Sequence, residues 1–172
     1  MIYFTSDTHF GDPRVLRLDR RPFPDLTSHD VALIALWNEI VREDDEIWHL
    51  GDFMSARAGD CAPLLDRLNG RKHLIIGNND PDEVVNASQW QSVQHYKELT
   101  VDGHLLILCH YPFRTWNKIG KNSINLHGHS HGKLKPILRQ FDAGVDAQAL
   151  RPVTLPQILA SRSKASQGQT SS

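Results

Sequence analysis

The sequence predicts a single domain with an α/β fold. Short apolar runs are bounded by Gly, Pro, Asn and Asp, and some of them are separated by stretches with helical spacing. A chain of 172 residues is long enough to bury one sizeable core, and it shows no internal repeat. We expect the domain to occupy residues 1–160 and the polar segment 161–172 to be disordered.

The amino-terminal part contains the first expected strand and helix. Residues 2–6 form a β-rich run that ends in a polar loop with a glycine. Residues 14–26 carry four arginines and two prolines, which resist regular structure, so we expect a basic surface loop there. A helix capped by Thr27 or Ser28 should follow, because a three-to-four spacing is kept by Val31, Ile34, Ala35, Asn38 and Val41.

Two more strands enclose a second helix. Residues 47–50 and 74–76 are short apolar strand candidates, and each runs into a polar segment that contains glycine. The helix between them covers residues 63–68. It is closed by Asn69-Gly70, since glycine lets the chain turn in the left-handed region.

The carboxy-terminal part predicts a hairpin and further strands. Residues 99–101 and 105–109 flank Asp102-Gly103, which is a tight-turn signal. Two strand-like runs and a short helix follow at residues 124–126, 137–141 and 155–160.

Composition and charge exclude several classes of protein. Nineteen basic against twenty acidic residues leave a net charge of −1, which does not favour extended nucleic acid or a membrane as partner. The longest clean apolar run, residues 31–37, is far shorter than the roughly 20 residues that span a bilayer. The sequence starts without a signal-peptide pattern, so we expect a cytoplasmic location. Cys61 and Cys109 lack the spacing of a disulfide framework or a zinc ribbon and should be reduced.

Polar side chains suited to metal binding follow five of the apolar runs. The five clusters are Asp7-Thr8-His9, Gly51-Asp52, Gly77-Asn78-Asn79-Asp80, Cys109-His110 and His127-Gly128-His129-Ser130-His131. In an open α/β sheet, the loops beyond the carboxyl ends of the strands meet at one crevice. We therefore expect these clusters to meet at one site, although they are far apart in the sequence.

Seven groups in these clusters are typical metal ligands. They are the carboxylates of Asp7 and Asp52, the imidazoles of His9, His110, His129 and His131, and the amide oxygen of Asn78. One divalent ion does not need seven ligands, whereas two ions that share a carboxylate do. Mixed nitrogen and oxygen donors without thiolate favour Mn, Fe or Zn over calcium. Two ions about 3.5 to 4 Å apart activate a bridging water and stabilise displacement at phosphorus, so the pattern predicts phosphoester hydrolysis.

The order of these motifs resembles that of a known family. Asp7-x-His9, Gly51-Asp52, Gly77-Asn78-x-Asp80, His110 and Gly128-His129-x-His131 resemble the calcineurin-like metallophosphoesterase superfamily. A compact bacterial single-domain subgroup is similar also in Phe4-Thr5-Ser6-Asp7-x-His9-Phe10-Gly11, Arg21-Pro22-Phe23, His110-Tyr111-Pro112, Gly144-Val145-Asp146 and Arg151-Pro152-Val153. The resemblance extends from residue 2 to about residue 158.

The resemblance implies a fold and an assignment of ligands. The fold would have four layers, α-β-β-α, in which a two-sheet β-sandwich is flanked by helices and carries a dinuclear metal site at the strand ends. The first ion would be held by Asp7, His9, Asp52 and His131. The second ion would be held by Asp52, Asn78, His110 and His129. Asp52 would then be the bridging carboxylate.

One position departs from the family pattern. Many relatives have a histidine where this chain has Asn79, and that histidine contacts the phosphoryl group and is often assigned as the acid for the leaving group. An amide can donate a hydrogen bond to a phosphoryl oxygen but has no titratable proton. We assign Asn79 to the catalytic region together with Asp52 and Asp80, with Asp80 fixing the loop. The expected substrates are phosphodiesters or esters with good leaving groups, unless a metal-bound water serves as the acid.

Residues beside the predicted ligands have two interpretations each. His127 is assigned to substrate binding because it adjoins two ligands, although it would point away from them if the strand continues. Arg114 and Trp116 follow His110 and would either form a wall of the substrate pocket, with Arg114 on a phosphate, or pack structurally.

The remaining basic residues are expected to be structural or solvated. The arginines of the 14–26 segment, including Arg21, would lie in solvent, with phosphate binding as the alternative. His49 is expected in the core. Surface positions are expected for His29, His73, His95 and His104.

The function that these observations favour is hydrolysis of a phosphomonoester or phosphodiester, with a small nucleotide-like substrate and attack by a metal-bridging hydroxide. Two alternatives stay open. One is a non-catalytic metal-binding scaffold with the same fold. The other is a nuclease, which the lack of a long basic stripe disfavours.

Overall fold

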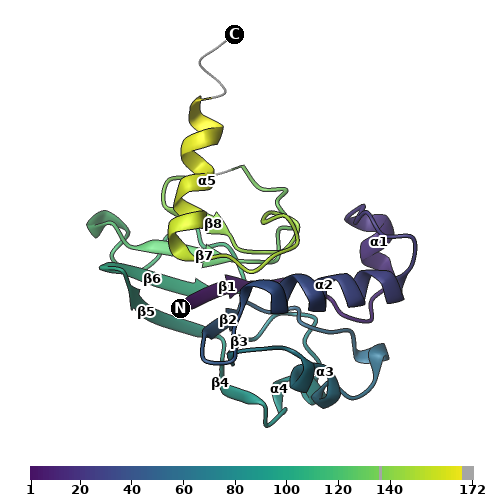
Figure 1. The fold of residues 1–172 in the computed structure, drawn as a ribbon. Coiled ribbons are helices and arrows are strands. Elements are labelled where there is room, and N and C mark those ends of the chain that lie inside the picture. Colours follow the sequence, from purple (N-terminus) through teal and green to yellow (C-terminus); the bar gives the residue numbers. More distant parts are fainter. Residues whose placement is uncertain (136, 168–172) are drawn as a thin grey trace.

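The computed structural model describes residues 1–135 and 137–167. The chain forms two four-stranded sheets that pack face to face (Figure 1). The strand orders are β1-β2-β3-β4 and β5-β6-β7-β8, so each sheet is built from one continuous part of the chain. The α/β class and the two-sheet sandwich are thereby confirmed.

The first sheet is parallel throughout. Its strands are β1 (Ile2–Thr5), β2 (Glu46–His49), β3 (Arg71–Ile75) and β4 (Trp90–Gln94). Parallel neighbours need crossover connections, which here carry α1 (Arg14–Leu18), α2 (Leu26–Ile40), a 3-10 helix (Ala56–Ala58), α3 (Ala62–Arg67) and α4 (Asp82–Val85). The carboxyl ends of β1, β2 and β3 therefore lie at the same end of the sheet.

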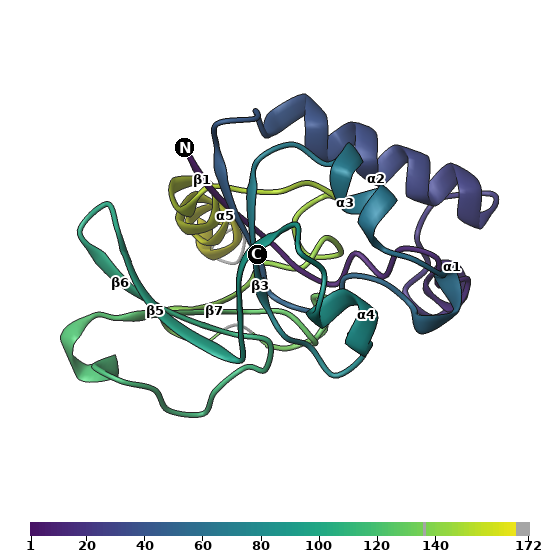
Figure 2. The ribbon, with the colours of Figure 1, turned by 90° about the horizontal axis from the view of Figure 1, so that it is seen from below.

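Side chains of the first sheet alternate between two cores. Tyr3 of β1 packs toward the helices and Phe4 toward the second sheet, and Ile47 and Trp48 of β2 divide in the same way. Figure 2 shows α2 and α3 on the side of this sheet that faces away from β5 and β6. Burial on both faces explains why consecutive apolar residues occur in β1 and β2, such as Tyr3 with Phe4 and Ile47 with Trp48.

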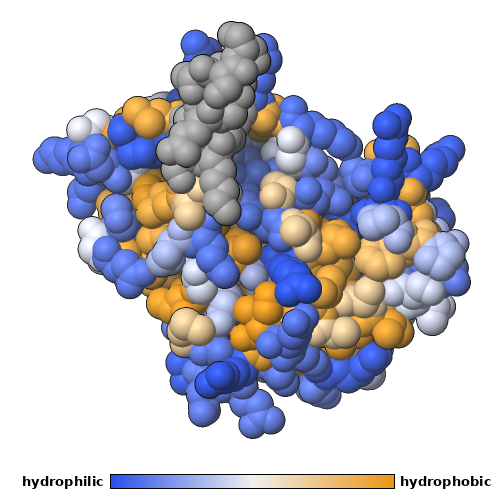
Figure 3. All heavy atoms as spheres, turned by 45° about the horizontal axis from the view of Figure 1, so that its top comes forward, coloured by the Kyte–Doolittle hydropathy of each residue, from blue (hydrophilic) through white to orange (hydrophobic). Residues whose placement is uncertain are grey.

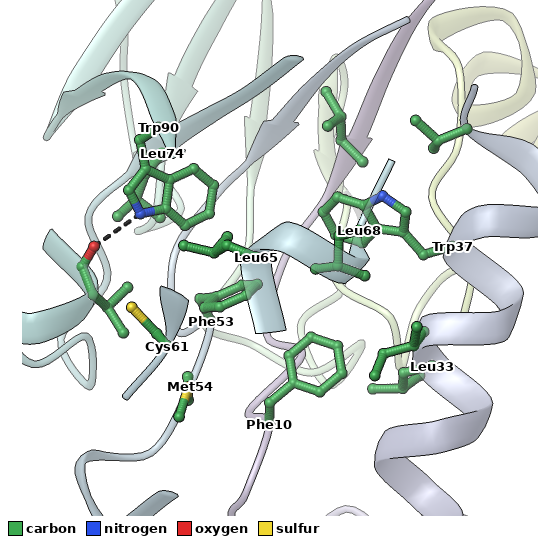
Figure 4. Packing of buried hydrophobic residues seen from close by; sticks show 14 of the residues in the cluster. Phe10, Leu33, Trp37, Phe53, Met54, Cys61, Leu65, Leu68, Leu74 and Trp90 are labelled. Atoms are coloured by element: carbon green, nitrogen blue, oxygen red, sulfur yellow. Dashed lines mark hydrogen bonds between the residues drawn. The ribbon is translucent and has the colours of Figure 1, made fainter. Parts of the chain in front are cut away.

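Aromatic residues anchor the loops after β1 and β2 in the helix-side core (Figure 4). The rings of Phe10 and Phe53 meet edge to face with centroids 5.3 Å apart. Trp90 packs on Phe53, and its indole N–H donates to the Val84 carbonyl at 2.8 Å. These contacts fix the backbone a few residues beyond the strand ends.

The second sheet begins with the predicted hairpin. β5 (Tyr96–Val101) and β6 (His104–Cys109) pair antiparallel. Asp102 and Gly103 between them have φ values of 50° and 79°, as a two-residue hairpin turn with both residues in the left-handed region requires.

The last elements complete the sheet and close one edge of the sandwich. β7 (Ile124–His127) follows a 3-10 helix (Ile119–Lys121), and β8 (Gln140–Asp142) and α5 (Leu155–Gln167) come after it. β7 is parallel to β6 and to β8. Leu155 and Ile158 of α5 enter the core between the sheets.

The helices are distributed unequally over the two sheets. Helices α2 and α3 cover the outer face of the first sheet, whereas α5 lies at the edge, next to a bridge between Phe4 and Val153. The outer face of the second sheet is contacted by the segment after β6, where the Gln140 side chain donates to the Phe113 carbonyl at 2.6 Å.

Two local expectations near the first loop are wrong. The segment 14–26 is not a continuous loop, because α1 forms at Arg14–Leu18 and α2 already starts at Leu26. The cap of α2 is Asp25 instead of Thr27 or Ser28, since the Asp25 carboxylate accepts the Ser28 N–H at 2.7 Å.

Other elements differ in extent. β4 and α4 were absent from the sequence pattern, because both are short and mixed in polarity. β8 covers only part of the expected run 137–141. Helix α5 continues to Gln167, so residues 161–167 are helical, contrary to the expected disorder, and 168–172 lie outside the described residues.

The surface and the cysteines agree with a reduced globular domain. Figure 3 shows hydrophobic residues in separate patches among hydrophilic ones on one face. Cys61 and Cys109 are both free and buried. Within the described residues, no helix is long and apolar enough to cross a membrane.

Candidate metal centre

The polar clusters meet where the strands of both sheets end. Backbone hydrogen bonds join the loops, from Asp7 N to the Gly51 carbonyl at 3.0 Å and from Gly128 N to the His110 carbonyl at 3.0 Å. The expected convergence of loops from β1, β2, β6 and β7 is therefore present.

Glycines allow these loops to approach closely. A Cβ atom on Gly51 would lie 2.6 Å from the Gly77 backbone, so the loops after β2 and β3 touch through their glycines. A Cβ atom on Gly128 would lie 1.9 Å from Ser6 Oγ and 2.6 Å from Asp7 Oδ2. Any larger residue at position 128 would displace Asp7.

Five of the seven predicted ligands have left-handed backbone, with φ between 49° and 65°. They are Asp7, His9, Asp52, His129 and His131. This conformation is costly for residues other than glycine and persists only where the surroundings enforce it. Such strain gathered in one group of side chains is typical of a functional site.

The first group of side chains is Asp7, His9 and His131, whose ligand atoms all lie within 4.8 Å of one another. Asp7 is completely buried, and its Oδ1 atom lies 3.9 Å from Nε2 of His131. The His9 and His131 rings stack with centroids 5.3 Å apart. These residues come from the two sheets and converge on one point.

A second group consists of Asp7, Asp52 and His110, again within 4.8 Å. Asp52 lies between the two groups, because its Oδ2 atom is 3.5 Å from His9 Nε2 and 3.6 Å from His110 Nε2. A carboxylate in this position can contact ions on both sides, as the resemblance implies for Asp52.

The remaining two predicted ligands adjoin the second group. Asn78 Oδ1 lies 3.1 Å from His110 Nε2. The His129 ring is 5.1 Å from the His110 ring, and the His129 backbone N–H donates to both carboxylate oxygens of Asp7 at 3.0 Å. The structure thus brings all seven predicted ligands into one neighbourhood.

The donor atoms are arranged in a way that suits binding to cations better than hydrogen bonding to one another. His110 Nδ1 donates to the Leu50 carbonyl at 2.8 Å, so Nε2 presents a lone pair toward the Asn78 oxygen. Buried His9 Nε2 has no hydrogen-bond partner within the described part of the chain. Buried polar atoms are normally paired, and lone pairs that face each other without a proton need a cation.

Burial also sets the protonation of these groups. It raises the pKa of Asp7 to about 8, because removing a carboxylate from water is costly and the nearby His131 offsets this cost only in part. Burial lowers the pKa of His9 to about 4 and lowers that of His110, so both imidazoles are neutral near pH 7. Neutral imidazoles beside poorly compensated carboxylates are suited to metal binding.

His131 is oriented by a carboxylate that does not belong to the predicted ligands. Its Nδ1 atom lies 2.8 Å from Asp146 Oδ2, which leaves Nε2 directed toward Asp7. Burial opposes charge on His131, but this hydrogen bond and the nearby Asp7 and Asp19 raise its pKa. A carboxylate behind a ligating histidine fixes its tautomer and increases its basicity.

Arg21 completes this arrangement, and its expected solvent exposure is wrong. Its guanidinium is buried and pairs with Asp146 through Nε at 2.9 Å and Nη2 at 2.8 Å. It also donates to the backbone carbonyls of Asp7 and Thr8. Burial alone would raise the pKa of Asp146, but hydrogen bonds from His131 and Arg21 hold it below its usual range.

His29 is another correction, because it is buried and not at the surface. Its Nδ1 atom lies 2.7 Å from the Asp30 carboxylate, so Nδ1 carries the proton and Nε2 accepts from Arg21 Nη1 at 2.9 Å. The chain thus surrounds Arg21 with acceptors, which accounts for its burial.

His49 is a core histidine, as expected. Its Nδ1 atom accepts the Gly51 N–H at 3.2 Å, and Nε2 lies 3.0 Å from Thr8 Oγ1. Complete burial lowers its pKa to about 3. His49 therefore supports the loops after β1 and β2 as a neutral ring.

Asp80 and Asn79 both contact the Asp52 loop. The Asp80 carboxylate accepts the backbone N–H groups of Gly77, Asp52 and Phe53 at 2.7 to 2.9 Å, which agrees with the loop-fixing role expected for it. Burial raises the pKa of Asp80. The Asn79 amide donates to Asp52 Oδ2 at 2.7 Å, on the oxygen that faces His9 and His110.

The other two predicted substrate contacts, His127 and Arg114, are not part of either group of ligand atoms. His127 is buried, and its Nδ1 pairs with the Gly128 carbonyl at 2.8 Å. It lines a cavity of about 200 Å³ beside Phe141 and Asp142, and none of the described lining residues is a predicted ligand. Arg114 is exposed, whereas Trp116 is buried and donates to the Ser123 carbonyl. Substrate contacts by His127 and Arg114 stay predictions.

Arg21, His29 and Asp146 are the supporting residues that sequence reasoning did not assign to the site. Arg21 and Asp146 lie in segments that resemble the bacterial subgroup, and this resemblance was the sequence feature that could have indicated their role. Nothing in the sequence pairs them, because they are 125 residues apart.

Comparisons with known proteins find several that are similar to this chain. An uncharacterized protein of Methanocaldococcus jannaschii is 26% identical over 167 residues, which cover 92% of this chain and 89% of that protein. The Gene 66 protein of Mycobacterium phage D29 is 31% identical over 183 residues, covering 85% and 88%. A solved structure of a protein of unknown function from Aquifex aeolicus has a TM-score of 0.74 at 22% identity, covering 92% and 97%.

A family model matches most of the chain. Residues 1–140 correspond to the calcineurin-like phosphoesterase superfamily domain, and this range contains all seven predicted ligands. The chain therefore belongs to the calcineurin-like phosphoesterase superfamily.

Proposed function

We propose that the protein is a metal-dependent phosphoesterase that hydrolyses a small, nucleotide-like substrate. The observation that carries the proposal is the place of Asp52, whose Oδ2 atom lies between His9 Nε2 and His110 Nε2 at 3.5 and 3.6 Å. Each of these histidines belongs to a separate group of ligand atoms. Such an arrangement favours two ions that share one carboxylate.

The donor set narrows the metal class. Carboxylate, imidazole and amide donors without thiolate favour Mn, Fe or Zn. When bound, a pair of such ions supplies an activated water and neutralises charge that develops on the phosphoryl oxygens. The chain supplies the orientation, because Leu50, Asp146 and Arg21 hold His110 and His131 in place.

Asn79 shapes the expected substrate preference. It is exposed next to Asp52, and its amide can donate to a phosphoryl oxygen but cannot release a proton to a leaving group. Substrates that need little help with departure should therefore react fastest. We propose phosphodiesters and aryl esters as the preferred classes.

The test is a turnover assay on protein stripped with a chelator and reloaded with Mn, Zn or Fe. The substrates are 4-nitrophenyl phosphate and bis(4-nitrophenyl) phosphate. Asp52→Asn removes the shared carboxylate, and Asp44→Asn is the matched control, because Asp44 is exposed between α2 and β2.

We expect metal-dependent turnover that Asp52→Asn abolishes and Asp44→Asn retains, and the ratio of the two rates shows whether monoesters or diesters are preferred. Metal binding without turnover of either ester would contradict the proposal and favour the non-catalytic scaffold. Equal turnover with and without metal would contradict it as well.

A further inference from the structure

A groove lined mainly by polar residues lies beside the candidate metal centre, along the loops after β1 and β2. Its volume is about 240 Å³. It is lined by Asp12, Pro13, Arg14, Ser55, Ala56, Arg57 and Asn79. The same two loops carry the predicted ligands Asp7, His9 and Asp52 a few residues earlier.

The groove is bounded by backbone that is held in place. Ser55 N donates to the Phe10 carbonyl at 2.9 Å, and Phe10 pairs with Met54 in a parallel bridge. A Cβ atom on Gly11 would lie 2.1 Å from Ala58 Cβ, so the loop after β1 packs directly on the 3-10 helix. The walls are therefore formed before any ligand binds.

Two contacts connect the groove with the metal centre. Asn79 lines the groove and donates to Asp52 Oδ2 at 2.7 Å. Asp12 N donates to the His9 carbonyl at 3.1 Å. A molecule with its phosphoester at Asp52 can therefore extend past Asn79 into the groove.

Charge in the groove favours an anion. Arg14 pairs with the buried Asp12 carboxylate through Nε at 2.9 Å and Nη2 at 2.6 Å, which fixes its guanidinium. Arg57 is exposed, and its guanidinium has no hydrogen-bond or ion-pair partner among the described residues. One carboxylate and two guanidinium groups leave a net positive charge, and guanidinium groups bind phosphate and carboxylate groups well.

We propose that this groove binds a second anionic group of the substrate and that Arg57 is the residue that determines this specificity. The substrate class is then a phosphoester with a further phosphate or carboxylate group at some distance from the reacting phosphorus. This inference rests on the proposed function, because it places the reacting group at Asp52.

Two substrates that differ by one phosphate group test the inference. They are the 4-nitrophenyl ester of thymidine 5′-phosphate and the same ester with a 3′-phosphate. Both have the same reacting diester and the same leaving group. The readout is the ratio of kcat/KM for the two esters, measured for the metal-loaded wild type, Arg57→Gln and Arg71→Gln.

We expect the wild type to prefer the 3′-phosphorylated ester about tenfold or more, which is the scale of a charge-assisted bidentate contact. Arg57→Gln should bring the ratio close to one. Arg71→Gln is the matched control and should keep the wild-type ratio, because Arg71 is an exposed arginine at the opposite end of the first sheet.

The outcomes separate this inference from the proposed function. Turnover of both esters with a wild-type ratio near one overturns the inference alone, and so does an unchanged ratio in Arg57→Gln. If neither ester is hydrolysed with any metal, the proposed function fails. In that case, the affinity for thymidine 3′,5′-bisphosphate, measured by calorimetry, tests whether the groove binds an anionic group. Weaker binding to Arg57→Gln than to Arg71→Gln supports it, and equal binding overturns it.

Discussion

Arg21 Nη2 lies 2.8 Å from Asp146 Oδ2, and this ion pair joins two segments that are 125 residues apart. The same guanidinium donates to the Asp7 and Thr8 carbonyls, and the same carboxylate pairs with His131. Arg21 thus connects the loop that carries Asp7 with the side chain of His131. It holds two predicted ligands of one ion in a fixed relation.

Arg21→Gln should weaken metal binding by roughly 10- to 100-fold, as the loss of a residue behind a ligand commonly does. The metal-free protein should also lose about 3–5 kcal/mol of stability, because the buried Asp146 carboxylate loses its guanidinium partner and keeps only the contact with His131. Metal titration followed by calorimetry and urea unfolding of the metal-free form measure the two effects.

Arg21→Lys keeps the charge but cannot form the two parallel hydrogen bonds, so its metal affinity should lie between wild type and Arg21→Gln. Arg71→Gln is the control for removal of an arginine at an exposed position. Metal affinity of Arg21→Gln equal to that of the control would show that Arg21 does not position the ligands.

Asp7 should make the metal-free protein less stable as the pH rises. Its folded-state pKa is raised to about 8, so the unfolded chain releases this proton near pH 4 while the folded chain retains it. The contribution of Asp7 to stability is therefore fully present below about pH 4 and is lost as the pH rises toward 8. Asp7→Asn removes this dependence.

The measurement is the difference in free energy of unfolding between Asp7→Asn and wild type from pH 4 to pH 9, without metal. We expect Asp7→Asn to gain stability relative to wild type across this range. Added Mn should stabilise the wild type at pH 8 more than Asp7→Asn, which lacks one predicted ligand of the first ion. A difference that does not vary with pH would contradict the assigned pKa.

Gly128→Ala should displace Asp7, because the new Cβ atom would lie 1.9 Å from Ser6 Oγ and 2.6 Å from Asp7 Oδ2. We expect a stability loss of about 1–3 kcal/mol and weaker metal binding. Gly120→Ala is the control, since nothing lies within 4 Å of its Cβ position. Thermal unfolding and metal titration of both variants are compared. Equal metal affinity in the two variants would show that this close approach is not required.

Asn79→His should restore a group that can protonate a leaving oxygen. Turnover of the dinucleoside phosphate TpT relative to bis(4-nitrophenyl) phosphate should rise about tenfold or more, because only the alkyl ester needs the acid. Asn79→Ala removes the amide without adding an acid and should give no such rise. An unchanged ratio in Asn79→His would mean that position 79 does not limit departure of the leaving group.

The candidate metal ligands could be selected from the sequence because each stands in a short motif after an apolar run. The apolar runs place Asp7, Asp52 and His129 beyond strand ends, and parallel strand topology brings these ends together. The sequence pattern predicted a hairpin and two further strands of the second sheet, and the resemblance to a family supplied their arrangement in a two-sheet sandwich.

The supporting residues could not be predicted in this way. Burial of Arg21 depends on Asp146 and His29. No local sequence pattern predicts the contact with Asp146, because the two residues are 125 positions apart. The basic segment therefore suggested a solvated loop, although it contains α1 and its Asp25 caps the following helix α2. The short strand β4 carries too few apolar residues to produce a period.

Anomalous diffraction from crystals of the Mn-loaded protein would test the dinuclear centre most directly. We predict two peaks about 3.5–4 Å apart. One should lie among Asp7, His9, Asp52 and His131, and the other among Asp52, Asn78, His110 and His129. A single peak, or peaks that Asp52 does not contact, would contradict this prediction.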